Sequence, residues 1–344
     1  MTTDQRKARR IIVISDSFHT IPEAVATLAA SGHDVTYVNG LTRWGELDEA
    51  GGRALRNAQA VVMGRVPGVD AAALSLAPLV RIIALHTSGS DTVDVGEASR
   101  RGVVVTNVKG VNAEQCAEFA MGLMLCVVRQ IVRGDRAIRA GQWNSVTHTS
   151  MDVYGATLGV VGLGGIGRAF VRRARAFGMK VIAHTRTPDM DLAQELDIEY
   201  MPLDDVLRRG DVVGVFASLS ASTKGMIGAR ELGLMKKSAY VINIARGELI
   251  DQGALLEALR TRQIAGAGLD VFDVEPLYTS PFFELDNVVL TPHQAGLTSG
   301  AKARAAVRAA RTALDGLGGT VPQDAINPLA FSASVNASKK LCRR

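Results

Sequence analysis

Short apolar runs rich in β-branched residues alternate along the chain with stretches whose apolar positions follow helical spacing. In the first hundred residues this pattern predicts five strands with helix-like stretches between them. Strands separated by helices are typical of a parallel sheet covered on both faces, because parallel strands need right-handed crossover connections. We therefore expect a first α/β domain, with strands at residues 11–14, 35–38, 60–63, 82–85 and 103–105.

A second series of strands follows a long predicted helix. Asn112 can cap this helix at its start. Its apolar positions include Phe119, Leu123, Met124, Val127 and Ile131. A final Ala- and Arg-rich helix, from about Ser299 to Leu314, is expected to return to the first domain, so that the chain crosses between the domains twice. The second series has six predicted strands, which suit one doubly wound domain, at residues 158–161, 180–183, 212–216, 240–244, 268–271 and 288–290.

Composition and charge narrow the class of protein. The 344 residues are 47% apolar and only 5% aromatic, which suits two α/β domains with cores of Ala, Val, Leu and Gly. The net charge of +5 comes from basic residues near the two ends, and the chain between them is slightly acidic. Basic ends of this kind are usually solvated, so we expect no nucleic-acid partner. The eight terminal charges are Arg6, Lys7, Arg9, Arg10, Lys339, Lys340, Arg343 and Arg344.

Cysteine usage and hydropathy indicate a cytoplasmic protein without a membrane partner. Cys116, Cys126 and Cys342 make an odd count with no C-x-x-C spacing, so neither a disulfide framework nor a metal site is expected. The longest apolar stretches, such as residues 120–128, are well short of a bilayer span, and no signal peptide opens the chain.

A glycine-rich motif follows the first strand of the second series. Such a G-x-G-x-x-G between a strand and a helix allows a tight turn, lets a pyrophosphate approach the backbone, and directs the helix N-terminus at its negative charge. A tight turn that holds no ligand is the alternative. The predicted cofactor-binding residues of the motif are Gly162, Gly164, Gly165, Ile166 and Gly167.

Three chemically competent side chains follow the last three strands. Arg246, Glu275 and His293 each stand just beyond a strand's carboxyl end, where open α/β sheets bind ligands. Taken singly, they could be a surface ion pair, a helix-entry acid and a turn histidine. Together, beside the predicted cofactor site, they suggest a reaction centre.

These motifs resemble the D-isomer-specific 2-hydroxyacid dehydrogenases, and the resemblance covers nearly the whole chain. Arg246 precedes Glu275 by 29 positions, and Glu275 precedes His293 by 18, in the order that the family uses. The segments that carry the resemblance are residues 160–167, 243–247, 268–276 and 291–296.

The resemblance implies hydride transfer between a nicotinamide cofactor and a 2-oxo acid or D-2-hydroxy acid. His293 would give a proton to the substrate's carbonyl oxygen, and would take it back in the reverse reaction. Glu275 would fix the tautomer of His293 and favour its imidazolium form. Arg246 would grip the substrate carboxylate with its planar guanidinium and polarise the carbonyl.

The resemblance also assigns binding residues outside this trio. Ser88 and Gly89 correspond to the substrate loop of the family, whose backbone N–H groups meet the carboxylate. Asp270 matches the aspartate that contacts the nicotinamide carboxamide, although a strand-end capping acid is the alternative. Ala245 is also placed among the cofactor-binding residues.

The identity of the cofactor depends on the end of the second strand of the nucleotide domain. Thr185 stands where an NAD site usually has an acid, and Arg186 follows it. A guanidinium can bind a 2′-phosphate, so NADP is favoured over NAD. The alternative is that Arg186 stacks on the adenine and the enzyme accepts NAD.

The predicted fold class is α/β, with two doubly wound parallel sheets joined by two crossings. Residues 1–106 and 297–330 would form a flavodoxin-like substrate domain, and residues 107–296 a Rossmann dinucleotide domain. Residues 331–344 are Ser- and Lys-rich without periodicity and are expected to be disordered.

Several functions remain open within this class. Reduction of a small 2-oxo acid such as glyoxylate or hydroxypyruvate suits Thr185 and Arg186, and a D-3-phosphoglycerate dehydrogenase-like enzyme is the runner-up. A nucleotide-sensing, corepressor-like module with little turnover is a different kind of alternative. The resemblance further implies a homodimer formed through residues 112–143.

Overall fold

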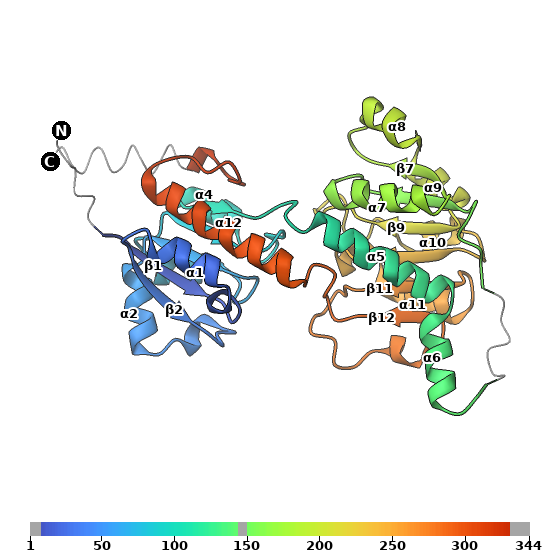
Figure 1. The fold of residues 1–344 in the computed structure, drawn as a ribbon, viewed down its shortest axis with the longest axis horizontal. Helices are drawn as coiled ribbons and strands as arrows, with labels where there is room; N and C mark the ends of the chain where they lie inside the picture. Colours follow the sequence, from blue (N-terminus) through green and yellow to red (C-terminus); the bar gives the residue numbers. More distant parts are fainter. Residues whose placement is uncertain (1–7, 144–149, 331–344) are drawn as a thin grey trace. The chain divides into compact units, whose positions relative to one another are not determined.

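The computed structural model describes residues 8–143 and 150–330. The disorder predicted for residues 331–344 concerns a segment outside these ranges. The chain divides into two compact units: unit 1 contains residues up to 112 and those from 298 onward, and unit 2 contains residues 113–297. Figure 1 shows the chain coloured from blue at the N-terminus to red at the C-terminus, with the long helix near the C-terminus lying among the elements of unit 1.

Unit 1 is built on a five-stranded parallel sheet with the order β2-β1-β3-β4-β5. This is the flavodoxin-like order, and it confirms the predicted fold class for this part of the chain. The strands are β1 (Arg10–Ile14), β2 (Asp34–Val38), β3 (Ala60–Met63), β4 (Ile82–Leu85) and β5 (Val104–Thr106). The helices are α1 (Pro22–Ala29), α2 (Glu49–Asn57), α3 (Ala71–Leu76), α4 (Val95–Arg100) and α12 (Ser299–Gly318), with short 3-10 turns at Phe18–Thr20 and Trp44–Glu46.

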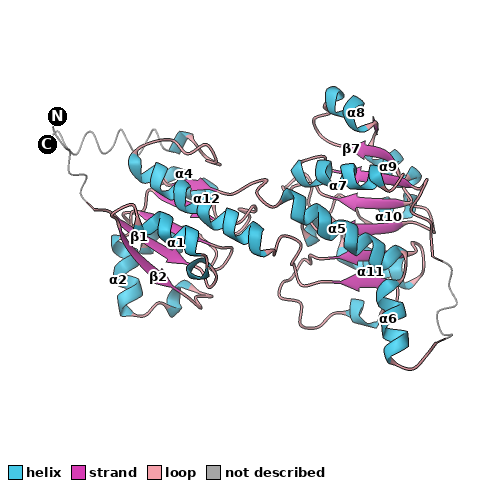
Figure 2. Cartoon of the chain, in the orientation of Figure 1, coloured by secondary structure: helices cyan, strands magenta, loops and turns pink. Residues whose placement is uncertain are grey.

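Alternate residues of each strand in unit 1 face two separate cores. Ile11 and Val13 of β1 pack toward α1 and α12, whereas Ile12 and Ile14 pack toward α2, α3 and α4. Side chains of successive strand residues point to opposite faces, so a strand buried on both faces is apolar throughout. This explains why the strands appear in the sequence as continuous apolar runs. Figure 2 shows the strands of each unit in magenta and the helices in cyan.

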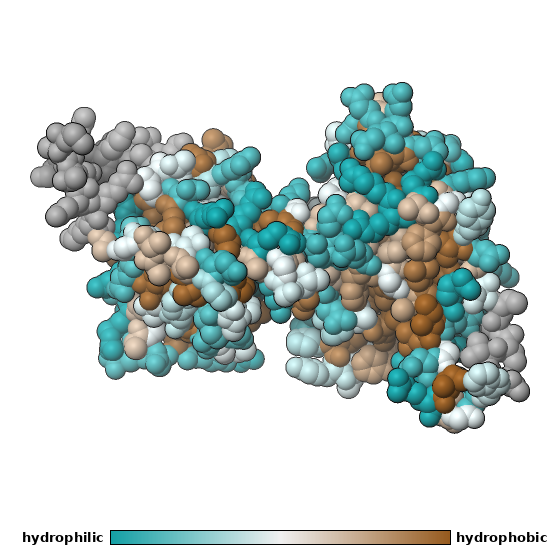
Figure 3. Space-filling view, in the orientation of Figure 1, coloured by the Kyte–Doolittle hydropathy of each residue, from teal (hydrophilic) through white to brown (hydrophobic). Residues whose placement is uncertain are grey.

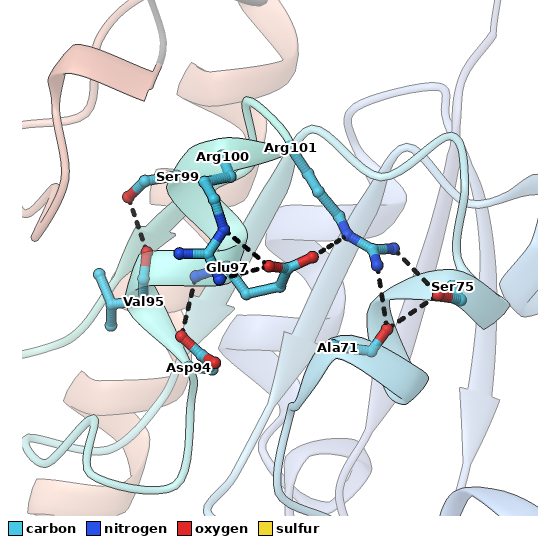
Figure 4. A network of polar contacts seen from close by, with 8 residues as sticks. All are labelled: Ala71, Ser75, Asp94, Val95, Glu97, Ser99, Arg100 and Arg101. Atoms are coloured by element: carbon cyan, nitrogen blue, oxygen red, sulfur yellow. Dashed lines mark hydrogen bonds and ion pairs between the residues drawn. The ribbon is translucent and has the colours of Figure 1, made fainter.

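A polar network joins two helices on one face of unit 1 (Figure 4). Glu97 of α4 accepts hydrogen bonds from Arg101 at 2.6 Å and from Arg100 at 2.9 Å. Arg101 also donates to Ser75 Oγ and to the Ala71 carbonyl oxygen of α3, at 3.1 and 3.2 Å. The hydrogen bonds from Arg101 and Arg100 hold the pKa of Glu97 below its usual range, so the carboxylate stays charged.

Unit 2 is built on a seven-stranded parallel sheet with the order β12-β11-β10-β9-β6-β7-β8. Within the unit this is the Rossmann strand order extended by one strand, and it confirms the second half of the predicted fold class. The strands are β6 (Thr157–Val161), β7 (Lys180–His184), β8 (Ile198–Tyr200), β9 (Val212–Val215), β10 (Tyr240–Asn243), β11 (Gly266–Leu269) and β12 (Val288–Leu290). The helices are α5 (Ala113–Val128), α6 (Ile131–Arg139), α7 (Gly165–Ala176), α8 (Met190–Leu196), α9 (Leu203–Arg209), α10 (Ala229–Leu234) and α11 (Gln252–Arg260), with 3-10 turns at Gly247–Leu249 and Pro281–Glu284.

The sheet of unit 2 also separates two cores. One core contains the buried faces of α5, α7 and α8, and the other contains those of α9, α10 and α11. Helices on both faces leave the ends of the strands as the accessible edge of the sheet, and functional residues are expected at the carboxyl ends.

Two predictions about unit 2 are wrong. The sheet has a seventh strand, β8, which three residues form after a left-handed turn at Asp197, and so short a strand has no recognisable periodicity. The long helix ends at Val128, and Ile131 begins a separate helix, α6, because Gln130 adopts a left-handed φ of 55°.

Within the described ranges, no single helix is both long enough and apolar enough to cross a membrane. Only the bent pair of α5 and α6, taken together, has the required length and composition.

Candidate active site

The glycine-rich loop lies between β6 and α7, where the strand order of unit 2 reverses. The chain runs from β6 outward to β7 and β8, then continues at β9 on the other side of β6. Such a switch point separates the loops on its two sides and leaves a crevice at the carboxyl ends of the strands. The predicted cofactor loop therefore occupies the position at which doubly wound sheets bind nucleotides.

Two glycines of this loop leave no room for a side chain. Gly162 has a φ of 94°, and a Cβ atom there would lie 2.5 Å from the backbone nitrogen of Ala217. A Cβ atom on Gly167 would lie 2.5 Å from the carbonyl oxygen of Gly162. Both positions require glycine for the loop to turn tightly against the next strand and for the helix to begin close to it.

The start of α7 is open by comparison. Gly164 is the N-cap of α7, and a Cβ atom on it would meet no described atom within 4 Å. The first N–H groups of this twelve-residue helix have no partner within the helix, and the positive end of the helix dipole lies with them. They lie next to Gly164, where open space lets an anion approach. These residues fit the pyrophosphate of a dinucleotide.

His293 and Glu275 form a close pair in unit 2. His293 lies just beyond β12, and its Nδ1 atom is 2.7 Å from Oε2 of Glu275. The other carboxylate oxygen, Oε1, accepts a hydrogen bond from the backbone nitrogen of Phe272 at 3.0 Å, which orients the carboxylate. An ionised carboxylate only accepts hydrogen bonds, so Nδ1 carries the proton of this contact.

The backbone at His293 is strained. Its φ is 50°, in the left-handed region that a non-glycine residue adopts at a cost of about 1 to 3 kcal/mol. The surrounding loop holds this conformation, because the His293 nitrogen donates to the Asp270 carbonyl oxygen at 2.9 Å. Strain maintained in this way is common at sites where a side chain must point in one direction.

Asp270 follows β11, and its carboxylate organises the loop that carries His293. The side chain is fully buried. Its Oδ1 atom accepts from Thr291 Oγ1 at 2.6 Å and from the Gln294 nitrogen at 2.9 Å, and Oδ2 accepts from the Ala295 nitrogen at 2.9 Å. Three donors compensate the burial of the charge. The predicted contact of Asp270 with a nicotinamide carboxamide remains a prediction.

Arg246 follows β10 and approaches the loop that carries Glu275. A Cβ atom on its neighbour Gly247 would lie 2.0 Å from the carbonyl carbon of Phe272, so the two loops touch through backbone alone. Buried Asn243 shapes the turn: its Nδ2 donates to the Arg246 carbonyl oxygen at 2.9 Å, and its Oδ1 accepts from the Ala245 nitrogen at 3.0 Å. The turn places Arg246 at the same sheet edge as Glu275 and His293.

Cys116 belongs to the surroundings of this site, although no motif in the sequence marks it as a functional residue. Burial and the negative charge of Asp270 raise the pKa of its thiol to about 11, and the positive charge of Arg246 partly opposes them. Cys116 is therefore a neutral thiol near the residues that follow β10 and β11. Its place in the first turn of α5 gave no signal, because only tertiary packing brings α5 against the sheet.

The predicted substrate loop belongs to unit 1. Ser88 and Gly89 follow β4, and the Ser88 hydroxyl donates to Oδ1 of Asn112 at 2.9 Å. Asn107 donates to the Ser88 carbonyl oxygen at 2.8 Å, and Thr87 Oγ1 donates to that of Gly89 at 3.0 Å. These carbonyl contacts fix the loop without using the backbone N–H groups that were predicted to meet a carboxylate.

Thr185 and Arg186 directly follow β7, as predicted. Thr185 is partly buried, whereas Arg186 is exposed. Arg186 makes no hydrogen bond or ion pair with another residue of the described ranges, so its guanidinium is available to a ligand. In the same ranges, no group of three His, Cys, Asp or Glu side chains is placed to hold a metal ion.

Comparisons with known proteins identify the family of the chain. The family model for the NAD binding domain of D-isomer specific 2-hydroxyacid dehydrogenases matches residues 121–295. A glyoxylate reductase from Pyrococcus horikoshii is 40% identical over 266 residues, which are 75% of this chain and 80% of the relative. The structure of a glyoxylate reductase from Paecilomyes thermophila superposes with a TM-score of 0.82 at 29% identity, covering 90% of this chain and 96% of that one.

A further solved structure is an NADPH-dependent glyoxylate/hydroxypyruvate reductase from Sinorhizobium meliloti in complex with NADP and malonate. Its TM-score is 0.82 at 27% identity, covering 94% of this chain and 98% of that one. Fold, motifs and relatives define the class of protein: an NAD(P)-dependent oxidoreductase that acts on the CH–OH group of its substrate. Within that class, the chain belongs to the D-isomer specific 2-hydroxyacid dehydrogenase family, and it binds a nicotinamide cofactor and a small 2-oxo acid.

Proposed function

We propose that this enzyme reduces a small 2-oxo acid, such as glyoxylate or hydroxypyruvate, with NADPH as the preferred cofactor. The 2.7 Å contact between His293 Nδ1 and Glu275 Oε2 carries the proposal, because it prepares the imidazole for proton transfer through Nε2. The similarity to glyoxylate reductases at 40% identity supports the choice of substrate.

His293 acts as the general acid during reduction. The glycine-rich loop would hold a reduced nicotinamide cofactor, which would supply the hydride for the carbonyl carbon of the substrate. As negative charge develops on the carbonyl oxygen, Nε2 of His293 gives it a proton, while Nδ1 remains bonded to Glu275. Glu275 stabilises the positive charge of the ring before transfer, and in the reverse reaction His293 takes the proton from the hydroxyl group.

Arg246 binds the substrate carboxylate. Its guanidinium presents several N–H donors in one plane, which match the two oxygens of a carboxylate and fix the orientation of the adjacent carbonyl. Ser88 and Gly89 of unit 1 are likewise proposed to bind substrate, through their backbone N–H groups. An anionic 2-oxo acid is thereby selected over a neutral ketone.

Thr185 and Arg186 set the preference for NADPH. Thr185 places a hydroxyl group at the end of β7 where a carboxylate would repel a phosphate, and the exposed Arg186 can neutralise one. The N-terminus of α7 would hold the pyrophosphate of either cofactor through its N–H groups and its helix dipole.

The enzyme acts as a homodimer through residues 112–143, which include α5 and α6. Ile131 and Ile138 are each 54% exposed, and Trp143 is 82% exposed. Figure 3 shows hydrophobic surface beside α6. A second copy of the chain would remove these side chains from water, and sedimentation of the purified protein tests this assembly.

Oxidation of NADPH and NADH by the purified protein tests the function. Glyoxylate, hydroxypyruvate, pyruvate, 2-oxoglutarate and larger 2-oxo acids are compared in parallel. We expect turnover with the smallest acids and a higher kcat/KM for NADPH than for NADH. Tight cofactor binding without turnover of any acid would refute the proposed reaction, and a preference for NADH would refute the role given to Arg186.

The catalytic assignment is tested with His293→Asn. We expect kcat to fall by about a hundredfold to ten-thousandfold, the range for loss of a general acid, while cofactor binding persists. His19→Asn is the matched control, since His19 is an exposed histidine of unit 1. Equal rates for the two variants would remove His293 from the mechanism.

A further inference from the structure

Arg168, in the first turn of α7, connects the two segments that flank the adenosine ribose in a doubly wound nucleotide domain. Its Nε donates to the carbonyl oxygen of Leu163, inside the glycine-rich loop, at 3.3 Å. One Nη2 hydrogen points to Oδ2 of Asp189, beyond the end of β7, also at 3.3 Å. The guanidinium therefore lies between the glycine-rich loop and the segment that follows β7, where such folds contact the ribose.

Arg168 keeps most of its hydrogen-bonding capacity. A guanidinium has five N–H donors, and two of them make the contacts to Leu163 and Asp189, so three make no hydrogen bond within the described ranges. The side chain is 41% exposed, which leaves it accessible to a ligand.

Both carboxylate oxygens of Asp189 accept hydrogen bonds within unit 2. Its Oδ1 caps α8 by accepting from the Leu192 nitrogen at 3.1 Å, and its Oδ2 faces Arg168. Its backbone is held as well, because the Tyr200 hydroxyl donates to the Asp189 carbonyl oxygen at 3.1 Å. The segment after β7 is thus anchored at Asp189, while Arg186, three residues earlier, remains exposed.

We propose that Arg168 and Arg186 together bind the 2′-phosphate of the cofactor, with Arg168 as a second specificity-determining residue that Asp189 holds in place and partly neutralises. The inference rests on the proposed preference for NADPH and adds a residue to it. Two guanidinium groups from different segments, α7 and the end of β7, enclose a doubly charged phosphate better than one exposed side chain does. The charge of Asp189 opposes the phosphate, so its removal strengthens binding.

The test compares adenosine 2′,5′-bisphosphate with 5′-AMP by calorimetry on the full chain, without nicotinamide or turnover. The ratio of the two dissociation constants isolates the 2′-phosphate. We expect Arg168→Gln to lower the preference for the bisphosphate by about threefold to tenfold, the range for loss of one half-exposed charge-assisted contact, with little change for 5′-AMP. Arg172→Gln is the matched control, because Arg172 lies one turn further along α7 and pairs with Glu195 at 3.8 Å.

Asp189→Asn tests the counter-charge independently. Asparagine caps helices as well as aspartate does, so α8 keeps its N-cap while the negative charge is lost. We expect the preference for the bisphosphate to rise by about threefold. This variant decides the matter if Arg168→Gln does not fold, since an unchanged or lowered preference in Asp189→Asn overturns the proposal.

The outcomes separate this inference from the proposed function. A wild-type protein that binds both nucleotides equally contradicts the preference for NADPH itself. A wild-type preference that Arg186→Gln removes and Arg168→Gln leaves intact overturns only the role of Arg168. Loss of the preference in both variants, with the Arg172→Gln control unchanged, supports the two-arginine site.

Discussion

Asp270→Asn should weaken unit 2 and misplace His293, although it changes a single atom of a side chain. Asp270 is fully buried, and its two carboxylate oxygens accept three hydrogen bonds. An asparagine presents one oxygen and one NH2 group. If the NH2 group replaces Oδ2, it faces the Ala295 nitrogen, and if it replaces Oδ1, it faces both Thr291 and the Gln294 nitrogen. Either orientation sets a donor against a donor.

The less costly orientation determines the magnitude. It leaves the buried N–H of Ala295 without an acceptor, which costs about 1 to 3 kcal/mol, and it weakens the other two bonds by removing the charge of their acceptor. Relief from burying a carboxylate offsets part of this loss. We expect the free energy of unfolding to fall by about 1 to 3 kcal/mol. Asp251→Asn is the control, because it exchanges the same groups at an exposed N-cap that asparagine also satisfies.

Three measurements test this reasoning. Urea unfolding gives the loss of stability, and kcat with a 2-oxo acid should fall by about tenfold to a hundredfold as the strained His293 loop relaxes. The charge of Asp270 contributes to the raised thiol pKa of about 11 at Cys116, so the variant should lower that pKa and speed alkylation of Cys116 by iodoacetamide. An unchanged unfolding midpoint together with unchanged alkylation would refute the argument.

Three further perturbations have defined outcomes. Gly162→Ala should abolish cofactor binding measured by fluorescence titration, because the new Cβ would lie 2.5 Å from the Ala217 nitrogen at a φ of 94°; normal affinity would contradict the need for glycine. His86 forms a hydrogen bond with Ser15, and burial lowers the pKa of His86 below its ordinary value of 6.5. Below pH 6.5 the unfolded chain therefore binds more protons at this residue than the folded chain does. The contribution of His86 to the free energy of unfolding is complete above pH 6.5 and is lost as the pH falls toward the folded pKa, by up to about 1.4 kcal/mol per pH unit. Urea titrations at several pH values measure this slope, and His86→Gln should flatten it. Thr185→Asp should lower the preference for NADPH over NADH by about tenfold in kcat/KM, and an unchanged ratio would argue against a phosphate near this residue.

The strands and the family could be predicted from sequence because their signals are local. Strands buried on both faces appear as continuous apolar runs, and the predicted runs coincide with strands of both sheets. The glycine motif is equally local as a signal, because it is read from consecutive residues, although the backbone that Gly162 meets, at Ala217, lies just beyond β9. The seventh strand and the break at Gln130 escaped prediction, because one is only three residues long and the other depends on a single left-handed residue.

The order of the strands explains why one part of the candidate site could be found and another could not. Arg246, Glu275 and His293 follow β10, β11 and β12, which are consecutive in sequence and adjacent in the sheet, so their convergence follows from the topology. Arg168 and Asp189 lie on different elements, and their contact depends on which way two side chains turn across the start of α7. The reacting end of such a site is therefore fixed by strand order, whereas its specificity for a cofactor depends on contacts that appear only once the chain has folded.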